Sequence, residues 1–228
     1  PAMTRLSTLA ALAALAALTT GQAHAAAANE FSNGGFETPG TTATSDPAPD
    51  AENWLESGGV GYSISNDART GSNALLLQVP GGLNSSVAVQ NSVEQGGNAP
   101  LVAGDTGEFS FWAKGDVGTT GNVLFALRYL DGVGNILFDS GNQFFQGQIN
   151  PTSYTEITYT PDPVPVGAVA AFVEFSHAIG PVGPQPGDVV FTEGAVLIDD
   201  VQLTTVPEPT SLALVGMGAL ALMRRRRA

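Results

Sequence analysis

Apolar and polar side chains alternate along the middle of the chain with the two-residue period of a β-strand. The alternation is clearest over residues 109–114 and 123–130, where every second residue is Phe, Val, Leu, Tyr or Ala. No stretch between residues 26 and 205 carries the stripe of an amphipathic helix. The pattern predicts an all-β fold, an antiparallel β-sandwich. Shorter alternating runs, bounded by Gly, Pro, Asn or Asp, are residues 74–79, 86–90, 154–160, 169–176 and 196–203.

The N-terminal residues 1–25 have the pattern of a secretory signal peptide. Arg5 is followed by an Ala/Leu-rich stretch over residues 6–18 and by Ala23-His24-Ala25, an Ala-x-Ala cleavage site. We therefore expect the Sec export machinery to be a partner and the mature chain to begin near Ala26.

The C-terminal residues 206–228 have the composition of a short membrane tether. Pro207, Glu208 and Pro209 form a rigid polar tripeptide, and an uncharged apolar run of residues 212–223 follows it. Twelve residues of helix span roughly 18 Å, less than the roughly 30 Å core of a bilayer, so we expect only a transient insertion into the inner membrane. Arginines stay on the cytoplasmic side, which places the preceding chain outside. The tail residues proposed to contact the membrane are Leu212, Leu214, Val215, Leu220 and Leu222, with Arg224, Arg225, Arg226 and Arg227 at its cytoplasmic end.

The order of tripeptide, apolar run and arginines resembles the PEP-CTERM sorting signal of Gram-negative bacteria. The resemblance implies processing at Pro207, Glu208 and Pro209 by a membrane protease-transpeptidase of the exosortase type. It also implies an inner-membrane anchored precursor that moves to the cell surface or the extracellular matrix. The alternative is an ordinary anchor that is never cut.

Residues 26–205 between the two signals are strongly acidic and are expected to form one domain. They contain twenty acidic residues but only Arg69, Lys114 and Arg128 as basic ones, a net charge of −17. Such a surface repels nucleic acid, so phosphate-backbone binding is excluded. The chain has no cysteine, so a core or a metal must stabilise it in place of disulfides.

Several motifs in this domain are similar, in order and spacing, to jelly-roll carbohydrate-binding modules with a galactose-binding-like fold. They are Asn-Gly-Gly-Phe-Glu at 33–37, Trp54, residues 67–75, residues 107–114, and Ile-Asp-Asp-Val-Gln-Leu at 198–203. The resemblance implies a structural calcium ion with Glu37 and Asp199 as ligands, because the first and last strands of a jelly roll lie close together. Carbonyl oxygens of the opening strand and of residues 67–72, with Asp67, would complete a hard oxygen site. In the alternative interpretation Glu37 and Asp199 are exposed strand-end carboxylates, and Asp67 only sets a turn.

A carbohydrate site needs an aromatic side chain against the apolar face of a sugar and polar groups for its hydroxyls. We expect Trp112 and Arg128 to share a sheet face, with Glu174 on a later strand and Tyr62 in a loop. For each aromatic, burial in the core is the competing interpretation. Phe144 and Phe145 are further candidates, either in a loop or with one ring inside and one outside a strand.

The sequence contains few residues suited to nucleophilic or acid–base catalysis. His177 is the only histidine outside the signal peptide, and the chain has neither cysteine nor a Gly-x-Ser-x-Gly motif. We therefore predict a non-catalytic, calcium-stabilised module that binds extracellular polysaccharide. The alternatives are a structural or adhesive matrix component and, third, an enzyme that cleaves polysaccharide with a pair of carboxylates.

Overall fold

A computed structural model of the chain describes residues 28–40, 51–80, 84–97, 101–118, 121–179 and 193–206. The predicted signal peptide and sorting tail lie outside these residues. The described residues form eleven β-strands and no helix, and so contain no helix that could cross a membrane.

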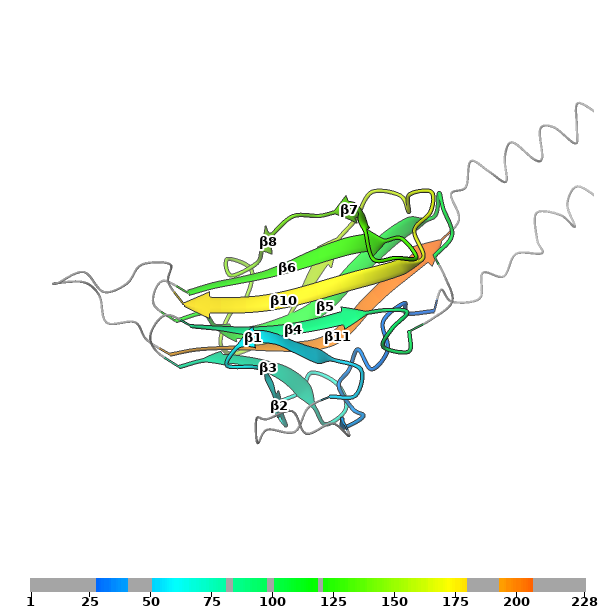
Figure 1. The fold of residues 1–228 in the computed structure, drawn as a ribbon. Coiled ribbons are helices and arrows are strands. Elements are labelled where there is room, and N and C mark those ends of the chain that lie inside the picture. Colours follow the sequence, from blue (N-terminus) through cyan, green and yellow to red (C-terminus); the bar gives the residue numbers. More distant parts are fainter. Residues whose placement is uncertain are drawn as a thin grey trace, which may run out of the picture.

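The strands form two antiparallel sheets, which Figure 1 shows as two layers. One sheet has the order β1 (Leu55–Gly59), β4 (Asn84–Asn91), β10 (Ala170–Ile179), β6 (Gly121–Leu130) and β7 (Ile136–Asp139), and β8 (Gln143–Phe144) also pairs with β6. The other has the order β2 (Ser63–Ser65), β3 (Ala74–Val79), β11 (Gly194–Val206), β5 (Thr106–Asp116) and β9 (Thr155–Tyr159). The prediction of an all-β antiparallel fold is confirmed. Every run that the alternation predicted coincides with a strand, whereas the short strands β1, β2, β7 and β8 were not predicted.

Aromatic rings fill the space between the two sheets. Phe111 of β5 lies 4.9 Å from Phe175 of β10 and 5.5 Å from Phe125 of β6, measured between ring centroids. Trp54 is also buried, 6.1 Å from Phe175, and its indole N–H donates a hydrogen bond to the carbonyl oxygen of Asn33. Burial of such large rings stabilises the sandwich in place of disulfides.

His177 belongs to this interior. It is fully buried on β10, and its Nδ1 and Nε2 lie 3.0 and 3.2 Å from the carbonyl oxygens of Leu77 and Val117. The imidazole is therefore held by main-chain groups and does not face a ligand.

The last strand, β11, is paired over its whole length. It runs beside β5 as far as the pair Val206 and Thr106. On the other side the N-terminal segment is attached to it, since Glu30 N–H donates to the Leu203 carbonyl at 2.8 Å and the Asn29 amide donates to the Val201 carbonyl at 2.8 Å. Regular structure therefore continues up to the residue that precedes Pro207.

Candidate functional site

Two of the predicted metal ligands, Glu37 and Asp199, hold the same loop. Glu37 Oε1 accepts hydrogen bonds from the main-chain N–H groups of Ser72 and Asn73, both at 2.9 Å. Asp199 Oδ2 accepts from Arg69 N–H at 2.8 Å and Thr70 N–H at 3.1 Å. The first and last parts of the domain thus meet at residues 69–73, as the motifs predicted.

The side chains of Glu37, Asp199 and Asp200 also border Gly35. A Cβ atom on Gly35 would lie 3.8 Å from Asp200 Oδ1, 3.9 Å from Asp199 Oδ1 and 3.9 Å from Glu37 Cγ. Asp199 is completely buried, and desolvation raises its pKa, although the N–H groups of Thr70, Arg69 and Asp200 oppose the shift. Burial of a carboxylate is costly, so Asp199 has the chemistry to accept a cation, whereas Glu37 is exposed.

Few side chains are available as ligands for such a cation. The described residues contain no group of three or more Asp, Glu, His or Cys side chains placed to hold a metal. A calcium ion here would take Glu37 and Asp199 as side-chain ligands and main-chain carbonyls for the rest, which is within the usual choice of calcium. The residues therefore fit the ion in chemical type.

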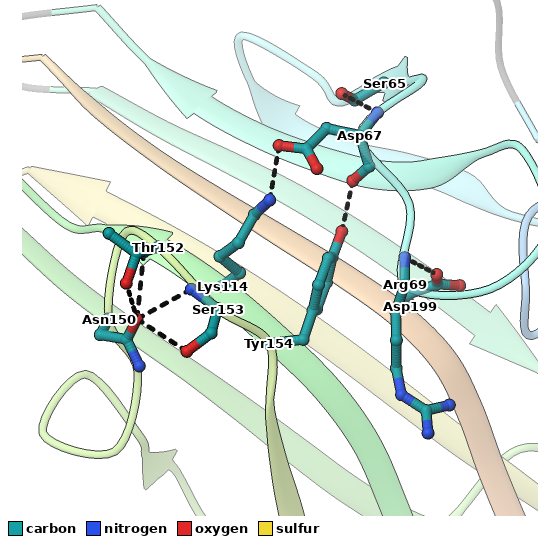
Figure 2. Close-up of polar contacts among 9 residues, drawn as sticks. All are labelled: Ser65, Asp67, Arg69, Lys114, Asn150, Thr152, Ser153, Tyr154 and Asp199. Atoms are coloured by element: carbon teal, nitrogen blue, oxygen red, sulfur yellow. Dashed lines mark hydrogen bonds and ion pairs between the residues drawn. The ribbon is translucent and has the colours of Figure 1, made fainter.

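Asp67 has a different partner from Glu37 and Asp199. Its carboxylate is paired with the ammonium of Lys114 at 2.5 Å, and its carbonyl accepts the hydroxyl of Tyr154 at 2.5 Å (Figure 2). Lys114 also lies 4.9 Å from the centroid of the Tyr154 ring. Asp67 thus anchors the start of the 67–73 loop to β5, beside a shallow hollow of about 440 Å³.

Trp112 points outward from β5, between the inward-facing Phe111 and Ala113. Its ring is covered by the guanidinium of Arg69, 3.7 Å from the ring centroid. Arg69 is held there by an ion pair with Asp200 at 2.6 Å. The face of Trp112 that a sugar would need is therefore occupied by a side chain of the domain itself.

The expectation that Trp112 and Arg128 share a sheet face is wrong. Trp112 is on β5 and Arg128 is on β6, and these strands belong to different sheets. Phe111 precedes Trp112 on β5, and Phe125 lies on β6 with Arg128. These two phenylalanines face each other across the core. Both candidates therefore point away from the core, on opposite outer surfaces of the sandwich.

Arg128 lies instead within a group of charged side chains on the six-stranded sheet. Its Nη1 donates to Glu174 on β10 at 3.1 Å, and its Nε donates to Asp139 on β7 at 3.2 Å. The guanidinium also lies 5.6 Å from the centroid of the Phe172 ring. Burial alone would lower the pKa of Arg128, but the hydrogen bonds to Glu174 and Asp139 raise it, so the side chain stays charged.

Apolar side chains surround this charged group. Cross-strand pairing places Phe172 between Asn91 of β4 and Arg128, and places Leu124 beside Phe144 of β8. Phe144 is 53% exposed while Phe145 is buried, so one ring is outside and one inside. We call this surface the Arg128 face. Its central residues are Asn91, Leu124, Arg128, Asp139, Phe144, Phe172, Glu174 and Ser176.

Sequence reasoning missed Phe172 and Asp139. Phe172 belongs to an alternating run whose other large residues face inward, and only the pairing of β10 with β6 reveals its place beside Arg128. Asp139 is on the short strand β7, which was not predicted.

Tyr62 is a core residue, which corrects its assignment as a ligand contact. Its side chain is only 3% exposed. The hydroxyl donates to the carbonyl of Trp54 at 2.9 Å, deep beside the N-terminal segment. Tyr62 lies between Gly61, which has a positive φ, and the start of β2 at Ser63, and its side chain is used in packing.

Among solved structures, the chain is similar to the enzymatically active domain of tailspike protein 4 from bacteriophage CBA120. The match has a TM-score of 0.53 and 22% identity, and it covers 78% of this chain and 21% of that protein. This shows a common sandwich fold, and the chain spans about a fifth of the tailspike's length.

Two carbohydrate-binding modules are also similar. The CBM22-1 xylan-binding domain from Paenibacillus barcinonensis Xyn10C matches with a TM-score of 0.46 and 16% identity, over 81% of this chain and 99% of that domain. TmCBM61 in complex with β-1,4-galactotriose matches with a TM-score of 0.45 and 19% identity, over 78% and 99%. No curated protein matches the sequence. A family model matches the C-terminal region, so residues 205–227 are a PEP-CTERM protein-sorting motif.

Proposed function

We propose that this protein is an exported, non-catalytic module that binds extracellular polysaccharide on the Arg128 face. The observation that carries the proposal is the group formed by Arg128, Glu174 and Asp139 beside the ring of Phe172. The group spans β10, β6 and the edge strand β7 of the six-stranded sheet, among partly exposed apolar side chains.

The chemistry of this group suits a sugar. The rings of Phe172 and Phe144 offer apolar surface to the C–H face of a pyranose, and Arg128 and Glu174 offer a donor and an acceptor for its hydroxyls. Because the ion pairs hold Arg128 between two carboxylates, these polar groups are already oriented before a ligand arrives. The ion pairs also compensate Glu174 and Asp139, which favours binding over acid–base catalysis by the two carboxylates.

The binding proposal predicts selective retention of one class of polysaccharide on a glycan array probed with the full chain. Arg128→Met is expected to weaken that binding about tenfold or more, since loss of a hydrogen bond to a charged group costs about 1.5–3 kcal/mol. Phe172→Ala is expected to weaken it as well, since it removes the apolar ring surface offered to the sugar. Glu108→Gln is the matched control, because Glu108 is exposed on β5, in the other sheet.

A blank array contradicts the proposal and favours a structural or adhesive matrix component. Binding that survives both substitutions would place the ligand elsewhere on the domain. Release of reducing ends from a bound polysaccharide would favour the enzyme. The melting temperature of each variant, measured first, separates a lost contact from a misfolded domain.

We also propose that an exosortase-type enzyme processes the sorting motif at Pro207, Glu208 and Pro209, after a transient insertion into the inner membrane. The match over residues 205–227 supports this proposal. Mass spectrometry of protein exported from cells with an active exosortase is expected to show a chain without the apolar run and its arginines. A Glu208→Ala variant should keep them. Persistence of the native C-terminus through Ala228 would exclude processing.

Calcium remains part of the proposal, with Glu37 and Asp199 as its ligands. The place of both side chains beside Gly35 and the burial of Asp199 support it. Positive φ angles at Phe36 (57°) and Asp200 (50°) turn the main chain sharply on both sides of the pair. Such backbone conformations are uncommon outside glycine and are often found at ligand clamps. The ion's role would be to stabilise the meeting of the two ends of the domain.

A further inference from the structure

One end of the sandwich carries most of the exposed aliphatic side chains. It is formed by residues 92–97 after β4, 101–105 before β5, 131–135 after β6 and 160–169 before β10, and we call it the tail end. Figure 1 shows these loops at the end where β11 finishes. The pairings of Val206 with Thr106, Leu130 with Ala170 and Asn91 with Phe172 place all these strand ends together.

The exposed side chains come from separate loops. Val133 is 84% exposed and Val166 is 89% exposed, and Val93, Val102 and Ile136 are also exposed at this end. Their neighbours Leu101 and Val164 are buried, so the loops already turn some aliphatic residues inward and leave others outside. Exposed apolar side chains that gather at one end of a domain favour an interaction surface there.

Hydrogen bonds fix the loops that carry these residues. Gly104 N–H donates to the Val164 carbonyl at 2.8 Å, and Val164 N–H donates to the Asp105 carbonyl at 2.9 Å, which joins two of the loops. Asp131 N–H donates to the Asn135 carbonyl at 2.9 Å within the third. Main-chain hydrogen bonds therefore hold these three loops in place.

The position of the sorting motif places this end of the domain near a membrane. Strand β11 ends at Val206, inside the motif, and only residues 207–211 separate it from the apolar run that begins at Leu212. Five extended residues reach at most about 18 Å. While the apolar run is inserted, the end of β11 must stay within that distance of the bilayer, and the tether gives even weak contacts of the neighbouring loops a high effective concentration.

We infer that the tail end rests on the lipid surface of the membrane that holds the C-terminal tail, and that it prefers headgroups without net charge. The four loop segments contain no Lys or Arg, but they carry Glu94, Asp105, Asp131 and Asp162. Anionic lipid therefore repels this end, while Val133 and Val166 can enter the interfacial region. The inference depends on the tail and not on sugar binding.

The absence of cysteine from the chain allows a direct test. Val133→Cys and Val166→Cys, each labelled with an environment-sensitive dye in the full chain, are reconstituted into phosphatidylcholine vesicles that contain a lipid with a headgroup quencher. The control is Asp116→Cys, at the opposite end of β5, about 33 Å from Thr106 at 3.3 Å per residue. Quenching at positions 133 and 166 is expected to exceed quenching at 116 several-fold.

Equal quenching at all three positions, or none at 133 and 166, overturns the inference and leaves these loops to water or to a protein partner. Replacing half of the phosphatidylcholine by phosphatidylglycerol is expected to reduce quenching at 133 and 166 at least twofold. Unchanged or stronger quenching with the anionic lipid overturns the proposed lipid preference. Matched melting temperatures of the labelled chains show that each is folded.

Discussion

Phe111→Ala is expected to lower the free energy of unfolding by about 3–5 kcal/mol, a large part of the 5–15 kcal/mol typical of a folded domain. Phe111 is completely buried and touches four other rings, with centroids 4.9 Å from Phe175, 5.0 Å from Phe145, 5.5 Å from Phe125 and 5.6 Å from Phe109. Its removal leaves a cavity at the place where both sheets meet. Urea unfolding followed by tryptophan fluorescence measures the change.

Phe144→Ala is the control for this experiment. Phe144 is on β8 and more than half exposed, so its loss should cost less than about 1 kcal/mol. An equal loss of stability in the two variants would contradict the core described here, because it would mean that exposed and buried rings contribute alike.

Asp199→Ala is expected to destabilise the domain by about 3 kcal/mol. Its carboxylate accepts main-chain N–H groups from Arg69, Thr70 and Asp200, at 2.8, 3.1 and 2.7 Å. An unpaired buried donor costs about 1–3 kcal/mol, and water entering the loosened loop recovers part of that loss. Asp199→Asn keeps an acceptor oxygen, so its effect should be clearly smaller. Thermal unfolding in calcium-containing buffer measures both variants.

A chelator separates the hydrogen bonds of Asp199 from the proposed calcium ion. If calcium is bound, a chelator lowers the melting temperature of the native chain and has little further effect on Asp199→Ala. No shift in the native chain would remove the ion from the proposal and leave the hydrogen bonds of Asp199 as its whole contribution. Wild-type stability in Asp199→Ala would exclude both roles.

Much of the fold could be predicted from the sequence because each long strand has its own signal. In β5, Phe109, Phe111 and Ala113 face the core and Ser110, Trp112 and Lys114 do not, as the alternation indicated. Short strands lack this signal. In β7, residues 136–139 are mostly exposed and apolar, so neither alternation nor burial identifies the strand.

The candidate sites were predicted less completely. Glu37 and Asp199 hold the same loop, and this was expected because the first and last motifs resemble those of a jelly roll, whose first and last strands lie close together. Asp67 was expected to be a ligand together with them, but its carboxylate forms an ion pair with Lys114 of β5. Tyr62 was expected to be accessible, although the carbonyl of Trp54 already accepts its hydroxyl.

The sequence by itself determined the local properties of this protein: which long strands form, which side of each long strand is apolar, that the domain is acidic and free of cysteine, and that a sorting motif follows it. Period-two alternation and composition are local properties, so they can be recognised in one segment without knowing which strand pairs with it. Only the tertiary structure decided which strands are neighbours. That pairing separates Trp112 from Arg128, brings Phe172 and Asp139 to Arg128, and gathers exposed valines from distant loops at the end of β11. These contacts join residues far apart in the chain, and alternation within one strand does not specify which other strand lies beside it.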